Sequence, residues 1–254
     1  MIAAGIDAGA KTVKAVVARD GVAVAKSMGP AGLDLAAVAD RLLKEAVGAA
    51  GIGWNDLAKI VVTGSGGTAV PFATNKVTVT RAMALAGARH DGTARTVIDV
   101  GAEESRAVRL DERGNLVDFA LNDKCAAGAG SFIEAMSRAL EVGVSDLGPL
   151  ALTTDRAVGM NAQCVIFAES EVVSLIHRKT PPAEIVRAAY AALANRVFVL
   201  LKKLGVNPVV MVVGGVARDP GFLDALARKL DTKLVVPPDP EYAGAYGAAL
   251  AGLK

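Results

Sequence analysis

Two cysteines are the residues of this chain with the most specific chemistry. Cys125 lies in the segment NDKCAAGAG (122–130), a turn rich in glycine and alanine that comes just before a helical pattern. Cys164 also precedes a helical pattern. The N-terminus of a helix stabilises a thiolate, which is the form of cysteine that binds metals. The competing interpretation is a small buried hydrophobic residue, which is the commoner fate of an unpaired cysteine.

The number of cysteines limits the kind of site that they can form. An iron–sulfur cubane generally needs about four thiolates, so the two cysteines of this chain would place such a cluster between two chains. A zinc site is disfavoured because His90 and His177 have no zinc-finger spacing to either cysteine. A disulfide is disfavoured because two cysteines and no secretory signal indicate a reducing cytoplasm.

Two turns that combine an aspartate with a glycine are candidates for phosphate binding. The first acidic turn is DAGAKT (7–12), and the second acidic turn is DVGAEES (99–105). Glycine lets backbone N–H groups approach phosphate oxygens, and an aspartate at a strand end can hold Mg²⁺ directly or through water. One such turn is usually ordinary hairpin chemistry. Two at equivalent points of a repeat, with Gly214-Gly215 after a late strand, indicate a nucleotide site.

Glu103 and Glu104 belong to the second acidic turn and have two interpretations. They could orient a water molecule or the metal, or they could be solvated turn carboxylates. The glycine pair 214–215 suits the close backbone approach that an adenosine requires.

A repeated pattern of strands positions the two acidic turns. Strands are predicted at 2–6, 13–18 and 22–25, with a hairpin signal at Asp20-Gly21, and again at 95–100, 107–110 and 116–121. The two halves therefore look like one unit used twice, with a boundary near residues 90–93. We predict an N-terminal lobe over residues 1–92 and a C-terminal lobe over residues 93–254.

Helical periodicity predicts the remaining elements. Helices are expected at 34–50, 80–88, after Cys125 to about residue 140, 165–176, 182–204, from 219 or 220, and 244–253, with further strands at 59–63, 209–213 and 233–236. The 254 residues are 52% hydrophobic with a net charge of +2, which argues against a nucleic-acid surface. The apolar runs are too short to span a membrane, so we expect a cytoplasmic protein.

Several of these motifs resemble those of a known family. The acidic turns and GGVA (214–217) resemble the phosphate and adenosine motifs of the acetate kinase, sugar kinase, Hsp70 and actin superfamily. The segments NDKCAAG (122–128) and CVIFAESEV (164–172) resemble the signature of the BadF/BadG/BcrA/BcrD ATPases, and the resemblance covers essentially the whole chain. That family includes activators of 2-hydroxyacyl-CoA dehydratases and ATPase subunits of class I benzoyl-CoA reductases. Within it, DVGAEE (99–104) and MNAQC (160–164) are most similar to the Q subunit of bzd-type benzoyl-CoA reductases.

The resemblance implies a duplicated actin/Hsp70/acetate-kinase-like (ribonuclease H-like) α/β fold with an ATP cleft between two lobes. The C-terminal helix would pack back on the N-terminal lobe. A dimer of ATPase subunits would share one [4Fe-4S] cluster, and ATP hydrolysis with Mg²⁺ would drive electrons from a ferredoxin-like donor to catalytic acyl-CoA reductase subunits. The implied catalytic residues are Asp7, Asp99, Glu103 and Glu104; the nucleotide-binding residues are Gly9, Ala10, Lys11, Thr12, Lys14, Gly101, Ala102, Gly214, Gly215, Val216 and Gly244; the cluster ligands are Cys125 and Cys164.

Departures from the family pattern leave alternatives open. Ala10 and Lys11 stand where hydroxyl residues usually follow the first glycine, and Ala102 replaces a common glycine. We therefore expect weaker ATP hydrolysis than in a more typical subunit, which fits a heterodimer, although a homodimer is also consistent. The competing functions are a homodimeric dehydratase activator, a small-molecule kinase of the same superfamily, and a non-catalytic subunit that holds half a cluster.

Overall fold

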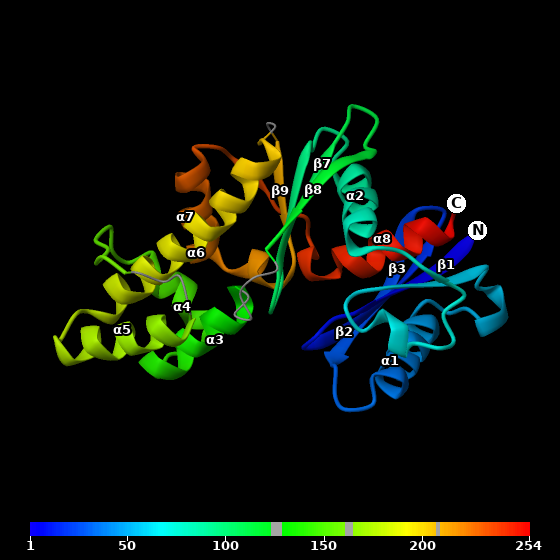
Figure 1. The fold of residues 1–254 in the computed structure, drawn as a ribbon. Coiled ribbons are helices and arrows are strands. Elements are labelled where there is room, and N and C mark those ends of the chain that lie inside the picture. Colours follow the sequence, from blue (N-terminus) through cyan, green and yellow to red (C-terminus); the bar gives the residue numbers. More distant parts are fainter. Residues whose placement is uncertain (123–128, 161–164, 207–208) are drawn as a thin grey trace. The chain divides into compact units, whose positions relative to one another are not determined.

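A computed structural model describes residues 1–122, 129–160, 165–206 and 209–254 (Figure 1). It contains two five-stranded sheets with the same connectivity. The first has the order β3-β2-β1-β4-β5 and the second the order β10-β9-β6-β7-β8, so each consists of a three-strand meander followed by two more strands on the side of its first strand. The strands of the first sheet are β1 (Ile2–Ala8), β2 (Thr12–Arg19), β3 (Val22–Pro30), β4 (Lys59–Thr63) and β5 (Asn75–Lys76). Those of the second are β6 (Thr96–Val100), β7 (Ser105–Leu110), β8 (Leu116–Leu121), β9 (Val210–Val213) and β10 (Leu234–Val235).

The chain packs into two compact units. Unit 1 comprises Met1–Val97, Val108–Asp118 and Pro237–Lys254, and unit 2 comprises Ile98–Ala107 and Phe119–Val236. The lobe boundary at residues 92 and 93 stays a prediction. The duplication of one strand unit is confirmed by the identical sheet orders.

In unit 1, one face of the first sheet is covered by α1 (Leu35–Ala49). The predicted cap Asp34 accepts a hydrogen bond from the N–H of Ala37 at 2.9 Å, so it satisfies a donor that the helix leaves free. Leu42 and Leu43 of α1 are fully buried in a core that also contains Ile6 of β1. The predicted hairpin at residues 20–21 is confirmed, because Asp20 and Gly21 both have positive φ.

The other face of the first sheet lies against α8 (Ala243–Gly252), and α2 (Val79–His90) packs against α8. Glycines allow very close packing here. A Cβ on Gly5 would lie 2.0 Å from the carbonyl oxygen of Ala245, and one on Gly247 would lie 1.9 Å from that of Ala82. The alanine- and glycine-rich composition of α8 therefore reflects close backbone approach to β1 and α2.

In unit 2, the strand residues that belong to this unit are buried against a group of helices. These are α3 (Ala129–Leu140), α4 (Val144–Ala151), α5 (Val165–His177), α6 (Pro182–Leu204) and α7 (Pro220–Leu230). Phe132, Met136, Ile185 and Phe222 are among the largest fully buried side chains of their common core. The sequence did not predict α4, which contains a proline, and the predicted strand at 233–236 is shorter in the structure.

Four short 3₁₀ helices complete the described structure: η1 (Trp54–Asp56), η2 (Gly67–Ala69), η3 (Gly215–Arg218) and η4 (Pro240–Tyr242). Within the described residues, every helix is too short or too polar to cross a membrane.

Candidate functional site

The first acidic turn places Asp7 at the end of β1 beside a lysine. Asp7 pairs in register with Lys14 on β2, and the Lys14 Nζ lies 3.7 Å from the Asp7 Oδ2. Both side chains are largely buried, at 19% and 15% exposure. The N–H of Gly9 donates to the carbonyl of Thr12 at 3.1 Å and closes the turn. An ion pair is thereby held next to the backbone of a tight turn.

Two further glycines bring the backbone close to the carboxylate of Asp7. Gly64 follows β4 with a φ of +94°, and a Cβ there would lie 2.6 Å from the Asp7 Oδ1. Gly244 is in the first turn of α8, where a Cβ would lie 3.1 Å from the Asp7 Oδ2. The first turn of a helix has free N–H groups and favours negative charge. The arrangement suits an anionic ligand or a hydrated cation bound to Asp7.

The second acidic turn repeats this geometry in unit 2. Asp99 is the penultimate residue of β6, and the Arg106 Nη1 on β7 lies 3.5 Å from the Asp99 Oδ2. The N–H of Gly101 donates to the carbonyl of Glu104 at 3.0 Å. Gly214 follows β9 with a φ of +90°, and a Cβ there would lie 2.5 Å from the Asp99 Oδ1. Asp99, Gly101, Arg106 and Gly214 therefore correspond to Asp7, Gly9, Lys14 and Gly64.

Arg106 and Gly64 are site residues that the sequence reasoning missed. The sequence did contain a signal for Arg106, because a basic residue follows the aspartate by seven positions in both turns. Glu104 also contacts the Arg106 Nη2, so it is a partner of the arginine rather than a purely solvated carboxylate. Glu103 is exposed to solvent.

The other predicted nucleotide residues have varied surroundings. Ala10 is exposed, and the carbonyl of Lys11 accepts a hydrogen bond from the N–H of Ala31 at 2.9 Å. Gly215 is exposed at the start of η3, whereas Val216 is buried in the core of unit 2. The partly buried Thr12 begins β2, and the partly buried Ala102 follows Gly101. The roles of these residues in binding stay predictions.

The predicted cluster ligands Cys125 and Cys164 lie outside the described residues. The residues that flank the Cys125 segment are described, and both sides bind to the hairpin of the second acidic turn. On one side, the N–H of Asn122 donates to the carbonyl of Ser105 at 3.0 Å. On the other, the N–H groups of Gly130 and Ser131 donate to the carbonyls of Gly101 and Ala102 at 3.0 and 2.9 Å. The segment that carries Cys125 is thus tied at both ends to one turn.

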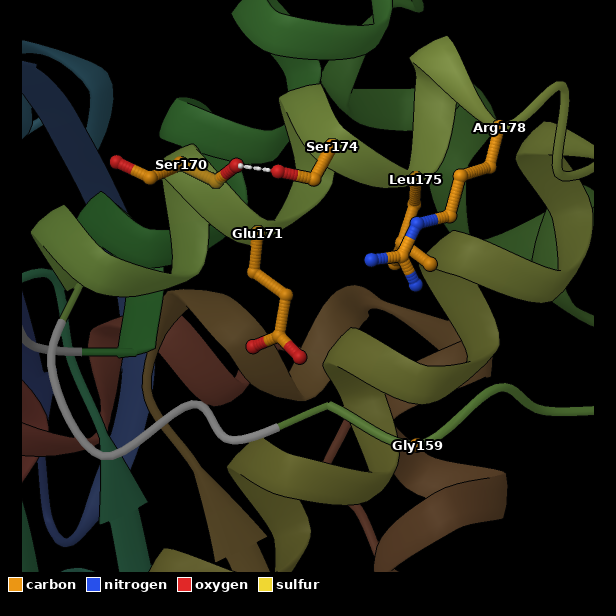
Figure 2. Close-up of a pocket in the computed structure, with 6 residues that line it drawn as sticks. All are labelled: Gly159, Ser170, Glu171, Ser174, Leu175 and Arg178. Carbon is orange, nitrogen blue, oxygen red and sulfur yellow. Dashed lines mark hydrogen bonds between the residues drawn. The ribbon is translucent and has the colours of Figure 1, made fainter.

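A hollow of about 310 Å³ lies beside α5, the helix that follows Cys164 (Figure 2). Glu171 of α5 and Arg178, the first residue after α5, lie around this hollow, and Gly159 lies across from them (Figure 2). The Ser174 Oγ donates to the carbonyl of Ser170 at 3.0 Å and so satisfies its hydroxyl within the helix. The sequence reasoning did not predict this hollow, because its residues have the spacing of an ordinary helix face.

Two relatives with described functions match this chain, one over nearly its whole length and one over about two thirds of it. The chain is 34% identical to the 2-hydroxyisocaproyl-CoA dehydratase activator of Clostridioides difficile, over 98% of this chain and 94% of that protein. It is 35% identical to a benzoyl-CoA reductase subunit of Thauera aromatica, over 63% of this chain and 58% of that protein.

Solved structures agree with the fold and extend the match to a nucleotide-bound relative. The activator of the 2-hydroxyisocaproyl-CoA dehydratase from Clostridium difficile with bound ADPNP superposes with a TM-score of 0.92, at 34% identity and with 99% of this chain and 94% of that chain covered. A ROK family glucokinase from Streptomyces griseus, at 15% identity, has a TM-score of 0.60 with 98% of both chains covered and shows the shared actin-like α/β fold alone. The model of the BadF/BadG/BcrA/BcrD ATPase family matches residues 4–252. The chain therefore belongs to the BadF/BadG/BcrA/BcrD ATPase family.

Proposed function

We propose that this protein is the ATP-driven activator of a 2-hydroxyacyl-CoA dehydratase. Two copies of the chain would share one [4Fe-4S] cluster, and ATP hydrolysis would drive a low-potential electron from a ferredoxin-like donor to the dehydratase. The full-length match to a dehydratase activator supports this choice. It favours the activator over the benzoyl-CoA reductase role that DVGAEE (99–104) suggested, because the match to the reductase subunit covers only 63% of this chain.

The observation that carries the proposal is the attachment of the Cys125 segment to the second acidic turn. Hydrogen bonds from Asn122, Gly130 and Ser131 end on residues of that turn, and the Gly130 and Ser131 donors belong to the first turn of α3. A displacement of the turn on nucleotide binding or hydrolysis would therefore move both ends of the cysteine segment. Such coupling requires two states of the turn that bind ATP and ADP differently.

The residues around both acidic turns fit a magnesium nucleotide. The carboxylates of Asp7 and Asp99 offer the hard oxygen ligands that Mg²⁺ prefers. Any side chain at Gly64 or Gly214 would collide with these carboxylates, so glycine lets the backbone approach each of them closely. Lys14 and Arg106 supply a cation next to each carboxylate, which suits phosphate oxygens.

The cysteines fit an iron–sulfur cluster by donor chemistry and number. Thiolates are the ligands that iron–sulfur clusters use, and two from each of two chains make the usual four. Within the described part of the chain, His, Cys, Asp and Glu form no group of three or more that could hold a metal ion. A bound cluster would supply one-electron chemistry at low potential.

Anaerobic purification tests the proposal. The chain should be brown and oxygen-sensitive, with about two iron atoms per chain, which is half of a shared four-iron cluster. Substoichiometric amounts, with ATP and a strong reductant, should activate the catalytic component of a 2-hydroxyacyl-CoA dehydratase. The control variant Cys125→Ser should keep nucleotide binding and lose iron.

Three outcomes would point to other functions. A stoichiometric requirement, together with activity only in complex with benzoyl-CoA reductase subunits, would support the reductase alternative. A colourless, iron-free chain that phosphorylates a small molecule would support the kinase. A chain that binds iron but neither hydrolyses ATP nor activates a partner would support a non-catalytic subunit.

A further inference from the structure

The hydroxyl of Thr63 is an unusual polar group in the interior of unit 1. Thr63 is the last residue of β4 and is fully buried. Among the described residues, its Oγ1 has no hydrogen-bond partner. A buried hydroxyl without a partner loses its hydration and gains nothing in return, and such groups in native proteins commonly mark a missing water or ion.

Strand register places this hydroxyl next to Asp7. Thr63 pairs with Asp7 in the parallel β1–β4 ladder, so the two side chains lie on the same face of the sheet, on strands about 5 Å apart. That face is the one covered by α8, because Val61, two residues before Thr63, packs with Ala248. The next residue after Thr63 is Gly64, whose backbone packs so closely against Asp7 that a Cβ there would lie 2.6 Å from the Asp7 Oδ1.

The duplicated unit shows that packing alone does not require a hydroxyl at this position. Gly64 corresponds to Gly214, so Thr63 corresponds to Val213, which is 1% exposed at the end of β9. Valine has nearly the same shape as threonine and carries no polar group to satisfy. The second unit therefore fills the equivalent position with an apolar side chain, whereas the first unit keeps an unsatisfied hydroxyl beside its aspartate.

We propose that Thr63 is a positioning residue for the metal–nucleotide complex at the first acidic turn. Its hydroxyl, which can both donate and accept, orders the hydration water of the cation that Asp7 holds. Mg²⁺ keeps several of its waters when it binds proteins, so a buried acceptor beside the carboxylate has a defined partner. This inference deepens the proposed function and rests on it, since it assumes that Mg²⁺–nucleotide binds at Asp7.

The test compares Thr63→Val with Thr63→Ser in the full chain. The readouts are the melting temperature without nucleotide and the affinity for ADPNP with and without Mg²⁺, measured by calorimetry. We expect Thr63→Val to melt at or above the wild-type temperature, because it removes an unsatisfied group. We also expect it to lose about tenfold of the affinity gain that Mg²⁺ confers, whereas Thr63→Ser keeps that gain.

Thr74 provides a matched control near the same strand. Its Oγ1 donates to the carbonyl of Ile60 at 3.0 Å and accepts from the Ile60 N–H at 3.1 Å, so its hydroxyl is structural. Thr74→Val should lower the melting temperature and leave the Mg²⁺ effect unchanged.

Two results would overturn the inference and can be told apart. If wild type shows the Mg²⁺ effect and Thr63→Val shows it equally, Thr63 has no role at the metal while the proposed function stands. If wild type binds no nucleotide with Mg²⁺, the proposed function fails as well.

Discussion

At the scale of single residues, the two acidic turns differ most in the cation that accompanies each aspartate. Lys14 pairs with the carboxylate of Asp7, whereas Arg106 contacts both Asp99 and Glu104. A guanidinium can bind two carboxylates at once through separate N–H groups, and an ammonium is a point charge that does this less well. Arg106 therefore fixes the position of Glu104 relative to Asp99.

Replacing Arg106 should weaken both the turn and the chemistry at it. Arg106→Gln leaves two nearby carboxylates without their cation, so we expect a loss of about 1–2 kcal/mol of stability and a fall of at least about tenfold in ATP hydrolysis. The stability and ATP hydrolysis of Arg106→Lys should lie between those of wild type and Arg106→Gln, because a lysine can form the same kind of ion pair that Lys14 forms with Asp7. Urea unfolding and a phosphate-release assay measure the two effects. Unchanged values in Arg106→Gln would rule out this role.

The sequence revealed only part of this residue-level geometry. Asp7 and Asp99 were predicted because each follows an apolar strand and precedes a glycine. The residues around Gly64 indicate only a flexible stretch, because a positive φ and a contact across two strands depend on sheet register, which a local pattern does not specify. Thr63 was missed for the same reason.

At the scale of elements, glycines in two helices have opposite packing environments. Gly247 of α8 faces α2, and a Cβ there would lie 1.9 Å from the carbonyl oxygen of Ala82. Gly48 of α1 is exposed, and a Cβ there would have open space around it. The first glycine is required by packing, and the second is not.

These two glycines should respond in opposite directions to the same substitution. Gly48→Ala should stabilise the protein by about 0.5–1 kcal/mol, because it reduces the entropy of the unfolded chain without a clash. Gly247→Ala should destabilise it by about 1–3 kcal/mol, because α8 and α2 must separate. Chemical denaturation of both variants checks the prediction, and a loss of stability in Gly48→Ala would contradict it.

The junction of α6 and α7 depends on a tyrosine that must stay protonated. The Tyr190 hydroxyl donates to Asp219, the residue whose side chain also caps α7 by accepting from the Phe222 N–H at 3.0 Å. Burial, and then the hydrogen bond to Asp219, raise the pKa of Tyr190 far above its ordinary value. The folded state thus keeps a proton that the unfolded state loses near pH 10.

The sign of this effect gives a pH-dependent prediction. Below about pH 10 both states are protonated, so the contribution of Tyr190 is fully present. Above that pH the folded state binds more protons than the unfolded state, and stability falls as pH rises. Tyr190→Phe should cost about 1–2 kcal/mol at neutral pH and flatten the alkaline decline. Urea unfolding midpoints measured between pH 8 and 11 test the stability cost and the flatter decline. If stability falls equally steeply with pH in Tyr190→Phe, other groups cause the alkaline decline.

At the scale of the whole molecule, the duplication was predictable and the attachment of the cysteine segment was not. The strand–turn–strand pattern repeats locally, so sequence periodicity indicates it directly, and the sheet orders agree. The bonds from Gly130 and Ser131 to Gly101 and Ala102 join residues almost thirty positions apart through backbone atoms alone. Side-chain identity does not encode such bonds, so only the folded structure shows that the second acidic turn and the Cys125 segment are connected.

Removing one of these bonds should separate ATP hydrolysis from activation. Ser131 is in the first turn of α3, where helical N–H groups have no partner within the helix and proline is tolerated. Ser131→Pro therefore deletes the donor to the Ala102 carbonyl at modest cost to the helix, whereas the control Ser131→Ala keeps that N–H. We expect Ser131→Pro to retain ATP hydrolysis and iron content but to lose most activation of a dehydratase partner. Because both variants lack the hydroxyl, equal activation by the two would show that the backbone bond does not transmit the nucleotide state.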